Sequence, residues 1–197
     1  SCVAFRASTR YFGLNIIFIM KVCIAQLNYH VGNFNLNSKK IISAIVQAKN
    51  ENADLIVFSE LSVCGYPPLD LLEQKDFVSS CSQYAKRIAS YCIGISAIIG
   101  CPILNKGKKG KNLYNAALFL SDGVIKSIHS KTLLPTYDIF DEYRYFEPNT
   151  EFSIINLKDE KIALTICEDI WDNQVIENSF SKDKIYQLSP MEKLIKH

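Results

Sequence analysis

The sequence lacks the short motifs that would assign its chemistry directly. Its seven cysteines form no CxxC pair and show no metal-type spacing to the three histidines, so a zinc site is a poor interpretation. Their odd number argues equally against a disulfide scaffold. No GxSxG motif is present, which leaves serine hydrolase chemistry without its usual nucleophile. No GKS or GKT follows the lysine- and glycine-rich tract 105–111, so a solvated hairpin loop is favoured there over a phosphate-binding loop.

The sequence also lacks a strong excess of either positive or negative charge. Lysine and arginine number 22 against 20 aspartates and glutamates, and this balance argues against nucleic acid or an anionic membrane as the main partner. The apolar stretch 11–20 is too short to span a bilayer. Cysteines without a pairing pattern suit a reducing compartment, where most act as small buried hydrophobes. We therefore expect a cytoplasmic protein with no nucleic-acid and no membrane partner.

The first 19 residues differ from the rest of the chain. The first 50 residues carry six basic and no acidic residues, whereas residues 51–197 carry 16 basic and 20 acidic ones. A secretory signal would end in a small-residue cleavage site, and Met20-Lys21 stands there instead. Two explanations stay open: residues 1–19 are a non-native leader ahead of a true start at Met20, or they are a targeting presequence. In both cases we expect the folded domain to cover residues 20–197.

Apolar patterning predicts one mixed α/β domain of ordinary size, with 48% apolar and 21% charged residues among 197. Continuous or alternating apolar runs indicate strands, and spacings of three and four residues indicate helices. The expected strands are 22–27, 54–59, 95–100, 113–120, 124–130, 152–157 and 162–166. The expected helices are 38–48, capped by Asn35 or Asn37, then 71–92 and a last one within 189–197. This order is βαβαβ followed by two hairpins.

Three titratable residues occupy the same architectural position. Glu60, Lys131 and Cys167 each follow a predicted strand. Reacting groups of α/β sheets gather at the carboxyl ends of strands, so these three can meet in space. Their chemistry is coherent, because a cysteine at a helix opening favours its thiolate, a carboxylate moves protons and an ammonium group stabilises an oxyanion. Such a cycle needs neither a metal nor an organic cofactor.

Each of these residues also has a plain structural explanation. Taken alone, Cys167 would be a buried core thiol, and Glu60 and Lys131 would be surface charges at strand ends. His129 is expected to be a satisfied structural histidine. The acidic residues within 168–172 could be paired carboxylates for glycoside hydrolysis, but the capped start of a helix explains them more simply.

Three longer motifs resemble a known family. They are FSELSVCGYPPLDLL (58–72), HSKTLLPTYDIFDEYRYFEP (129–148) and LTICEDIWD (164–172). In this order they resemble the nitrilase superfamily of carbon–nitrogen hydrolases, with its Glu, Lys and Cys triad. More narrowly, they resemble the amino-terminal glutaminase domain of glutamine-dependent NAD synthetases. The resemblance runs from Lys21 to the end of the chain and implies an α/β fold of the nitrilase type, an αββα sandwich truncated at its C-terminal side.

The resemblance implies a role for each matching residue. Glu60 would be the general base and acid, Lys131 the oxyanion stabiliser, and Cys167 the nucleophile that becomes a glutamyl thioester. Glu142 matches the additional glutamate that the superfamily places beside the lysine. The other six cysteines are then expected to be packing residues.

Further implications concern the substrate and the partners. Tyr66 and Tyr137 fall where this family lines its glutamine pocket, although a packing role is an equal alternative for both. Synthetases of this type continue into an ATP-using domain with an SGGxDS loop, which does not occur in this sequence. ATP, magnesium and deamido-NAD are therefore expected as ligands of that absent synthetase domain. Members of the family assemble into symmetric homo-oligomers, and we expect the same of the full-length protein.

Three functions remain as hypotheses. The main one is the glutamine-hydrolysing part of a glutamine-dependent NAD synthetase, which releases ammonia for ATP-dependent amidation of deamido-NAD. The first alternative is a stand-alone amidase of the same superfamily that acts on another small amide. The second is a catalytically silent scaffold for subunit assembly. For the segment itself we expect no metal and no cofactor.

Overall fold

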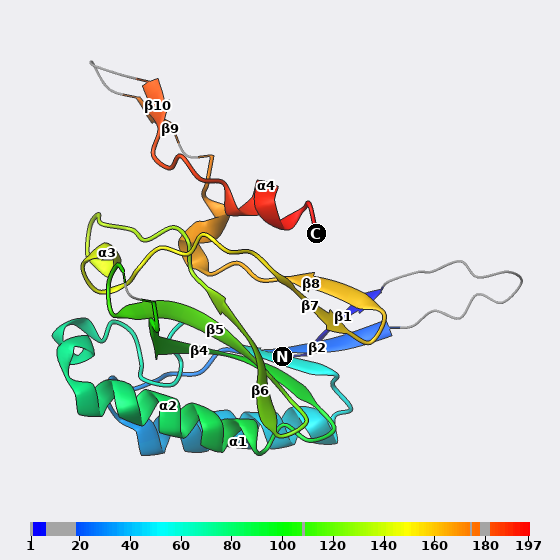
Figure 1. The fold of residues 1–197 in the computed structure, drawn as a ribbon. Coiled ribbons are helices and arrows are strands. Elements are labelled where there is room, and N and C mark those ends of the chain that lie inside the picture. The colour runs from blue at the N-terminus through cyan, green and yellow to red at the C-terminus, as the bar shows by residue number, and fades with distance from the viewer. Residues whose placement is uncertain (1, 7–18, 108, 174, 178–181) are drawn as a thin grey trace, which may run out of the picture.

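The described part of the chain forms three layers. A computed structural model describes residues 2–6, 19–107, 109–173, 175–177 and 182–197. Two helices cover one face of a six-stranded sheet, and a two-stranded sheet packs against the other face (Figure 1). One layer of helices and two layers of sheet make up the mixed α/β fold that we expected.

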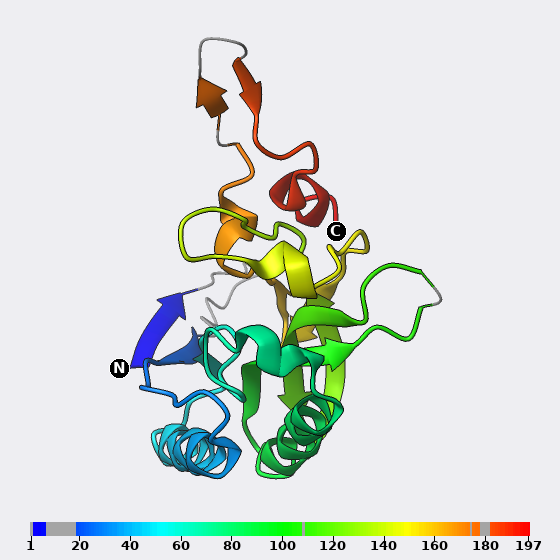
Figure 2. The ribbon, with the colours of Figure 1, turned by 90° about the vertical axis from the view of Figure 1, so that its left-hand side faces the viewer.

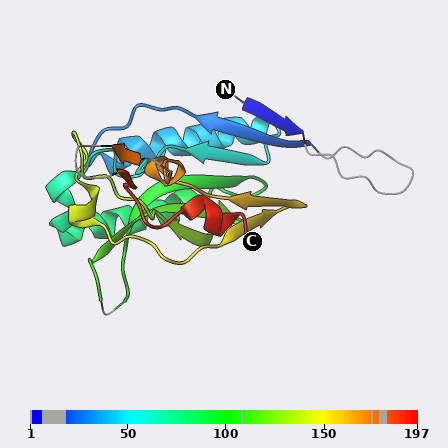
Figure 3. The same ribbon diagram turned by 90° about the horizontal axis from the view of Figure 1, so that it is seen from above.

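The six-stranded sheet provides the edge on which the candidate site is built. Its strands are β1 (Cys2–Arg6), β2 (Ile19–Ala25), β3 (Leu55–Phe58), β4 (Ser96–Leu104), β5 (Leu113–Ser121) and β6 (Val124–Ser130). They lie side by side in chain order, with β2 to β4 parallel and the other neighbours antiparallel (Figure 3). The carboxyl ends of β3 and β6 therefore lie at the same edge as the amino end of β5.

Strand β1 comes from the segment that we expected to be a leader. It pairs antiparallel with β2, from Cys2 opposite Cys23 to Arg6 opposite Ile19. Strand β2 accordingly begins three residues before the predicted strand 22–27. Residues 7–18 lie outside the described residues, so both explanations of the leader stay predictions.

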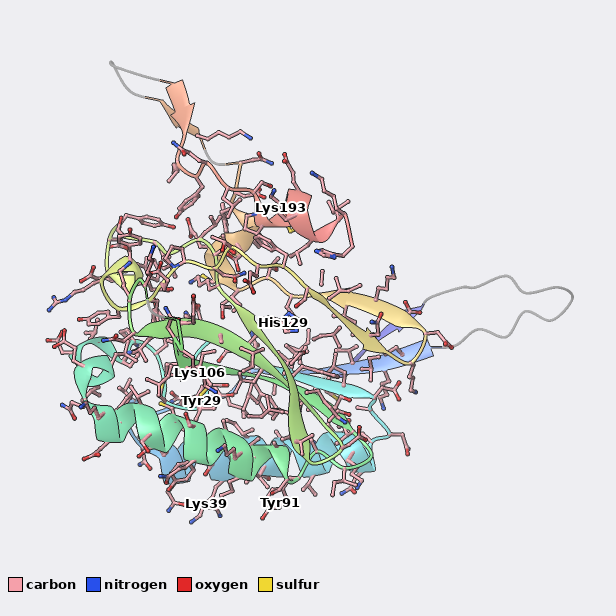
Figure 4. The ribbon with its side chains drawn as sticks, viewed as in Figure 1. Tyr29, Lys39, Tyr91, Lys106, His129 and Lys193 are labelled. Carbon is pink, nitrogen blue, oxygen red and sulfur yellow. The ribbon has the colours of Figure 1, made fainter. Side chains whose placement is uncertain are left out.

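Helices α1 (Phe34–Asn50) and α2 (Lys75–Ala89) form the layer on one face of the sheet, where Figure 2 shows both end-on. Ile41, Ile45 and Ile88 on their inner sides are completely buried. On the opposite side of α1, Lys39 points away from the sheet (Figure 4). The apolar stripes that predicted these helices therefore face the core.

The predicted caps of the first helix are wrong. Asn33 caps it instead of Asn35 or Asn37, because the Asn33 side chain accepts a hydrogen bond from Leu36 N at 3.1 Å. Asn37 is fully buried, and its amide binds both the N–H and the C=O of His30, at 2.9 and 2.8 Å. A contact outside the helix thus decides which of three nearby asparagines serves as the cap.

The second helix is shorter than the predicted range 71–92. It follows a separate 3-10 helix, η1 (Leu69–Glu73). Gln74 between them has an extended backbone (φ −87°, ψ 118°), which interrupts the helical hydrogen-bond ladder. The apolar residues of η1 continue the helical spacing in sequence although they belong to a different element.

Most cysteines are packing residues, as predicted. The buried ones are Cys23, Cys64, Cys81, Cys92 and Cys101. The last four of these are also free thiols, whereas Cys23 is disulfide-bonded, so the expectation of unpaired cysteines is wrong for Cys23. The side chain of Cys2 lies outside the described ones, and Cys167 is exposed. The exposure of Cys167 contradicts the plain alternative that it is a buried core thiol.

The second sheet is separate from the first. Its strands are β7 (Ile154–Leu157) and β8 (Glu160–Ala163), an antiparallel pair. Ile155 from this pair and Ile166 after it pack against apolar side chains of the large sheet, which are Val22, Leu55, Ile98, Ala117 and Phe119. The predicted strand 162–166 is therefore too long, because Leu164 to Ile166 leave the ladder to enter the core between the sheets.

The remaining elements lie beyond the second sheet or connect it to the first. They are α3 (Glu142–Tyr145), the 3-10 helix η2 (Cys167–Ile170), strands β9 (Val175–Glu177) and β10 (Lys182–Lys184), and α4 (Pro190–Leu194). The β9–β10 pair extends away from the large sheet (Figure 1). The helix predicted within 189–197 is confirmed. Across the described residues, no helix combines the length and the apolar composition needed to cross a membrane.

Candidate active site

Glu60 lies in the loop after β3, which is fastened closely to β4. Val63 N donates to Gly100 O at 3.1 Å, and Gly100 N donates to Ser62 Oγ at 3.1 Å. A Cβ atom at position 100 would overlap the backbone of Glu60 and Leu61. Glycine at this point of β4 therefore lets the loop approach closely enough to place the Glu60 carboxylate over the sheet edge.

Lys131 follows β6 and is completely buried. Its Nζ lies 2.7 Å from Glu60 Oε1, and 2.9 and 2.8 Å from the two carboxylate oxygens of Glu142. An ammonium group has three N–H donors, so these contacts satisfy it fully. We call Glu60, Lys131 and Glu142 the lysine–glutamate cluster. The structure therefore brings three of the predicted site residues into direct contact.

The two carboxylates determine the charge state of the cluster. Burial alone would lower the pKa of Lys131, but the charges of Glu60 and Glu142 outweigh it and raise that pKa above its ordinary value. Burial, followed by the charge of Glu60, raises the pKa of Glu142, while Lys131 opposes the shift. Lys131 thus stays positively charged, and the cluster as a whole carries an excess of negative charge when both glutamates are ionised.

Tyr66 supports the cluster from the side. Its hydroxyl donates to Glu142 Oε1 at 3.1 Å, and its half-buried ring lies 6.4 Å from the ring of Phe140. Burial, with the nearby Glu142 charge, raises the pKa of Tyr66 well above its ordinary value. Tyr66 is therefore a neutral donor to the carboxylate, and its role in lining a substrate pocket stays a prediction.

Cys167 opens η2 on the other side of the site. Its backbone is left-handed (φ 48°), a conformation that residues with a side chain rarely adopt. A cavity of about 130 Å³ reaches from Cys167 to Glu60. Its lining residues are Val57, Phe58, Ser59, Glu60, Ile98, Gly100, Ala116, Ala117, Leu164, Thr165, Ile166 and Cys167. The predicted nucleophile and the predicted base therefore share one cavity.

The expected thiolate at Cys167 is wrong for the resting structure. Partial burial of the sulfur raises the pKa of the Cys167 thiol, and the charges of Glu60 and Glu142 add to this, while the Lys131 charge lowers it. The helix opening is only a four-residue 3-10 turn, which aligns few peptide dipoles toward the sulfur. The sulfur is consequently a thiol at neutral pH and needs a base to become a nucleophile.

Asp169 connects the turn that carries Cys167 to the segment directly after Lys131. One carboxylate oxygen accepts hydrogen bonds from Thr132 N at 3.0 Å and Leu133 N at 2.9 Å. The other oxygen accepts from Ile166 N at 3.0 Å. Asp169 therefore does cap the turn, as predicted, and it also links that turn to the residues directly after Lys131.

Glu168 is held by two tyrosines. Tyr137 and Tyr186 each donate a hydroxyl hydrogen bond to it at 2.8 Å. The hydrogen bond to Glu168 and partial burial raise the pKa of Tyr137. Tyr137 is therefore anchored next to Cys167, whereas Tyr66 is anchored next to Lys131. The role of Tyr137 in lining a substrate pocket also stays a prediction.

Sequence reasoning missed Asn115, which is central to the arrangement. It lies on β5 with 1% of its surface exposed, and its Nδ2 donates to Glu60 Oε1 at 2.7 Å and to Glu142 Oε2 at 3.3 Å. A signal was present, because an amide within the apolar strand 113–120 needs a buried hydrogen-bond partner. Tyr186 was missed as well, and no local pattern marks it.

Two expectations outside the cluster can be compared with the structure. The ring nitrogens of His129 lie 2.9 Å from Ser127 Oγ and 3.3 Å from Ser153 Oγ, and Figure 4 shows this histidine between the large sheet and the β7 segment. The prediction of a satisfied structural histidine is therefore confirmed. Within the described residues, no group of three or more His, Cys, Asp or Glu side chains could hold a metal ion.

Known proteins match this chain over most of its length. The model of the family described as carbon-nitrogen hydrolase matches residues 21–178. Glutamine-dependent NAD(+) synthetases of Synechocystis sp. and Thermotoga maritima are 38% and 37% identical, over 88% and 78% of this chain. The matches cover 31% and 26% of those two proteins. The chain thus spans less than a third of the length of these curated relatives.

Solved structures agree with the sequence comparison. The glutamine-dependent NAD+ synthetase from Acinetobacter baumannii superposes with a TM-score of 0.69 at 37% identity, over 76% of this chain and 28% of that one. An amidase from Nesterenkonia sp. superposes with a TM-score of 0.64 at 20% identity, over 77% of this chain and 56% of that one, which shows a shared fold. The chain belongs to the carbon-nitrogen hydrolase family.

Proposed function

We propose that this chain hydrolyses the side-chain amide of glutamine as the glutaminase part of a glutamine-dependent NAD synthetase. The observation that carries the proposal is the cavity shared by Glu60 and Cys167, with Lys131 in contact with Glu60. A nucleophile, a proton carrier and a fixed positive charge are the parts that amide hydrolysis through a covalent intermediate requires. The names of relatives at 37–38% identity support glutamine as the amide.

The first half of the proposed cycle forms a thioester. Cys167 Sγ attacks the amide carbon while Glu60 takes the thiol proton, which gives a tetrahedral intermediate. The C–N bond then breaks, and Glu60 passes its proton to the departing nitrogen, which leaves as ammonia. The raised pKa of Cys167 makes this base necessary, because the sulfur is protonated before the attack.

The second half releases glutamate. Water attacks the thioester carbon while Glu60 accepts one of its protons. The C–S bond then breaks, and the departing sulfur takes the proton from Glu60, which restores the thiol. One amide and one water give one carboxylic acid and one ammonia, and the protein returns to its starting state.

Lys131 supplies the positive charge for the oxyanion in both halves. One of its N–H groups turns from Glu142 to the oxygen as negative charge develops there. A preorganised donor of this kind contributes a factor of roughly 10² to 10³ in rate. Glu142 holds Lys131 charged and in place between these events, at 2.8 and 2.9 Å.

Two tyrosines complete the proposed site. Tyr66, anchored on Glu142, and Tyr137, anchored on Glu168, line the place where glutamine binds. Their ring faces supply apolar contact while their hydroxyls are engaged with carboxylates. The proposed steps use neither a metal ion nor an organic cofactor.

The rest of the proposed activity belongs to a longer protein. There the ammonia amidates deamido-NAD in an ATP- and magnesium-dependent reaction. Support for this comes from the relatives, which are named NAD(+) synthetases and of which this chain matches 26–31%. A cytoplasmic location and a homo-oligomeric state of that protein are further parts of the proposal.

The test separates the two nitrogen sources. In the full-length protein, Cys167→Ala should abolish NAD synthesis driven by glutamine and leave synthesis driven by ammonia within about twofold. Cys167 is exposed, so its replacement should also leave stability almost unchanged. The measurement is NAD formation with each nitrogen source in turn.

Cys92→Ala is the matched control. Cys92 is a completely buried free thiol, so this variant should lose stability and keep both activities. Equal loss of both activities in Cys167→Ala would contradict the division of labour. Hydrolysis of other small amides without any NAD synthesis would support the stand-alone amidase instead. Failure of a glutamine-like electrophile to label Cys167 would support the silent scaffold.

A further inference from the structure

Asn115 contacts every member of the lysine–glutamate cluster. Its Nδ2 lies 2.7 Å from Glu60 Oε1 and 3.3 Å from Glu142 Oε2. Its backbone C=O accepts a hydrogen bond from Lys131 N at 2.8 Å. One residue of β5 therefore spans the gap between the β3 loop, which carries Glu60, and the end of β6, which leads into Lys131.

The hydrogen bonds to Glu60 are both made to one of its two carboxylate oxygens. Lys131 Nζ and Asn115 Nδ2 both donate to the same oxygen, Oε1. A carboxylate oxygen with two close donors is held in position, and the plane of the carboxylate is held with it. The other oxygen, Oε2, accepts neither of these two hydrogen bonds, and Glu60 lines the cavity that it shares with Cys167.

The amide of Asn115 can point in only one useful direction. Its two N–H groups face two carboxylates, whereas its carbonyl oxygen would be repelled by them. In the described structure Oδ1 is buried and has no hydrogen-bond partner. A buried acceptor without a partner costs stability, so the contacts on the nitrogen side must be favourable enough to hold the amide in this orientation.

We infer that Asn115 is a positioning residue, which holds the Glu60 carboxylate by a hydrogen bond and turns it so that Oε2 receives the Cys167 proton. This inference rests on the proposed function, since it concerns how Glu60 works as the base. Asn115 touches no reacting atom in this scheme and acts through Glu60 and Glu142. A neutral group with two donors suits this task, because a second cation would weaken the coupling between Lys131 and the carboxylates.

Two substitutions at this position separate positioning from packing. Asn115→Ala removes both donors and leaves a small cavity, whereas Asn115→Asp keeps the shape and places acceptors against two carboxylates. A packing residue would tolerate Asn115→Asp better than Asn115→Ala, because shape is kept. A positioning residue would tolerate it worse at neutral pH, because it adds a like charge.

The measurements are kcat and KM for glutamine hydrolysis against pH, in the full-length protein. Asn115→Ala should lower kcat about 10- to 100-fold, as expected for a lost hydrogen bond to a charged group, with KM changed less than about threefold. The acidic limb of the profile should move to higher pH, because the ionised carboxylates lose a donor. Asn115→Asp should have the lower kcat at neutral pH, and Asn115→Ser, which keeps one donor, should lie between wild type and Asn115→Ala.

Asn37→Ala is the matched control, because Asn37 is an equally buried asparagine whose amide binds backbone groups. It should lower the melting temperature and leave the acidic limb in place. An unmoved acidic limb in Asn115→Ala, or higher kcat in Asn115→Asp than in Asn115→Ala, would overturn the inference while the proposed function stands. A wild-type protein without glutamine hydrolysis would instead reject the proposed function and, with it, this inference. Asn115→Ser provides the same readouts if Asn115→Ala fails to fold.

Discussion

The two sides of the candidate site are constructed in different ways. On the lysine side, Glu60, Asn115 and Lys131 lie on or directly after strands of the six-stranded sheet, and their side chains bind one another. On the other side, Cys167 lies on a short turn after the small sheet and is exposed. The turn is linked to the lysine side through Asp169 and its backbone hydrogen bonds.

The difference matches the different needs of the groups. Charges interact strongly and hold a defined geometry only where water is excluded, which requires burial in the sheet edge. The sulfur that we propose as the nucleophile must meet a substrate that arrives from solvent, which requires exposure. We therefore expect substitutions on the lysine side to change stability and activity together, and substitutions on the cysteine side to change activity more than stability.

The largest effect is expected from Lys131→Met. The buried carboxylate of Glu142 and the partly buried one of Glu60 would lose their shared cation, and removal of one partner from a buried ion pair typically costs about 3 to 5 kcal/mol. We expect that loss in the free energy of unfolding, measured by chemical denaturation, together with loss of glutamine hydrolysis. Lys126→Met is the control, because Lys126 is exposed and pairs with Asp122 at 3.0 Å on the surface. Comparable stability of both variants would show that the cluster does not support the fold.

The next effect concerns the close approach of β4 to the Glu60 loop. Gly100→Ala would place a Cβ against the backbone of Glu60 and Leu61, and overpacking of this kind costs about 1 to 3 kcal/mol. The loop must move, so glutamine hydrolysis should fall at least tenfold. Gly107→Ala is the control, since the added Cβ there meets the side chain of Asn105, which can move. Full activity in Gly100→Ala would mean that the loop position is unimportant for Glu60.

A smaller effect is expected for the link between the two sides. Asp169→Asn replaces one acceptor oxygen by a donor that faces backbone N–H groups, at a cost of about 1 to 3 kcal/mol. The Cys167 turn should shift relative to Lys131, and kcat should fall more than stability predicts. Asp172→Asn is the control, because Asp172 is equally buried but binds Ser189 and Met191 near α4. Equal activities of the two variants would contradict the linking role.

The smallest expected effect is a shift in the pH at which the Cys167 thiol reacts. The Glu60 charge helps to raise the pKa of Cys167, so Glu60→Gln should favour the thiolate. The midpoint for alkylation of Cys167 by iodoacetamide should therefore move to lower pH, even though glutamine hydrolysis is lost. Mass spectrometry of the Cys167 peptide against pH measures this midpoint. Glu73→Gln at an exposed site should leave it unchanged, and an unchanged midpoint in Glu60→Gln would show that the carboxylate does not act on the sulfur.

Local patterns predicted most elements of the fold but not their ends or partners. The apolar run 54–59 corresponds to β3, because a strand buried on both faces needs such a run. The end of β8 at Ala163 was missed, because packing between the sheets draws Ile166 out of the ladder. The cap was missed because His30, outside the helix, binds Asn37. Each miss reflects a contact between segments that sequence spacing does not encode.

The site shows the same division. The position of Glu60 and Lys131 at the carboxyl ends of strands was predictable, because β3 and β6 run in the same direction and so end at one edge of the sheet. The contacts of Asn115 were not predictable, since they depend on β5 lying between β4 and β6. The charge state of Cys167 could not be predicted either, because it depends on partial burial of the sulfur and on the nearby charges of Glu60, Glu142 and Glu168 in the folded chain.

The negative excess of the lysine–glutamate cluster has a consequence for turnover. In the proposed reaction, the substrate brings an uncharged amide to Cys167, whereas hydrolysis leaves a carboxylate at the same place. With Lys131 shared between Glu60 and Glu142, the new anion meets like charge at short range. We therefore expect the product to be expelled electrostatically, so that inhibition by glutamate should be weak. It should strengthen at lower pH, where Glu142, whose pKa burial raises, takes up a proton.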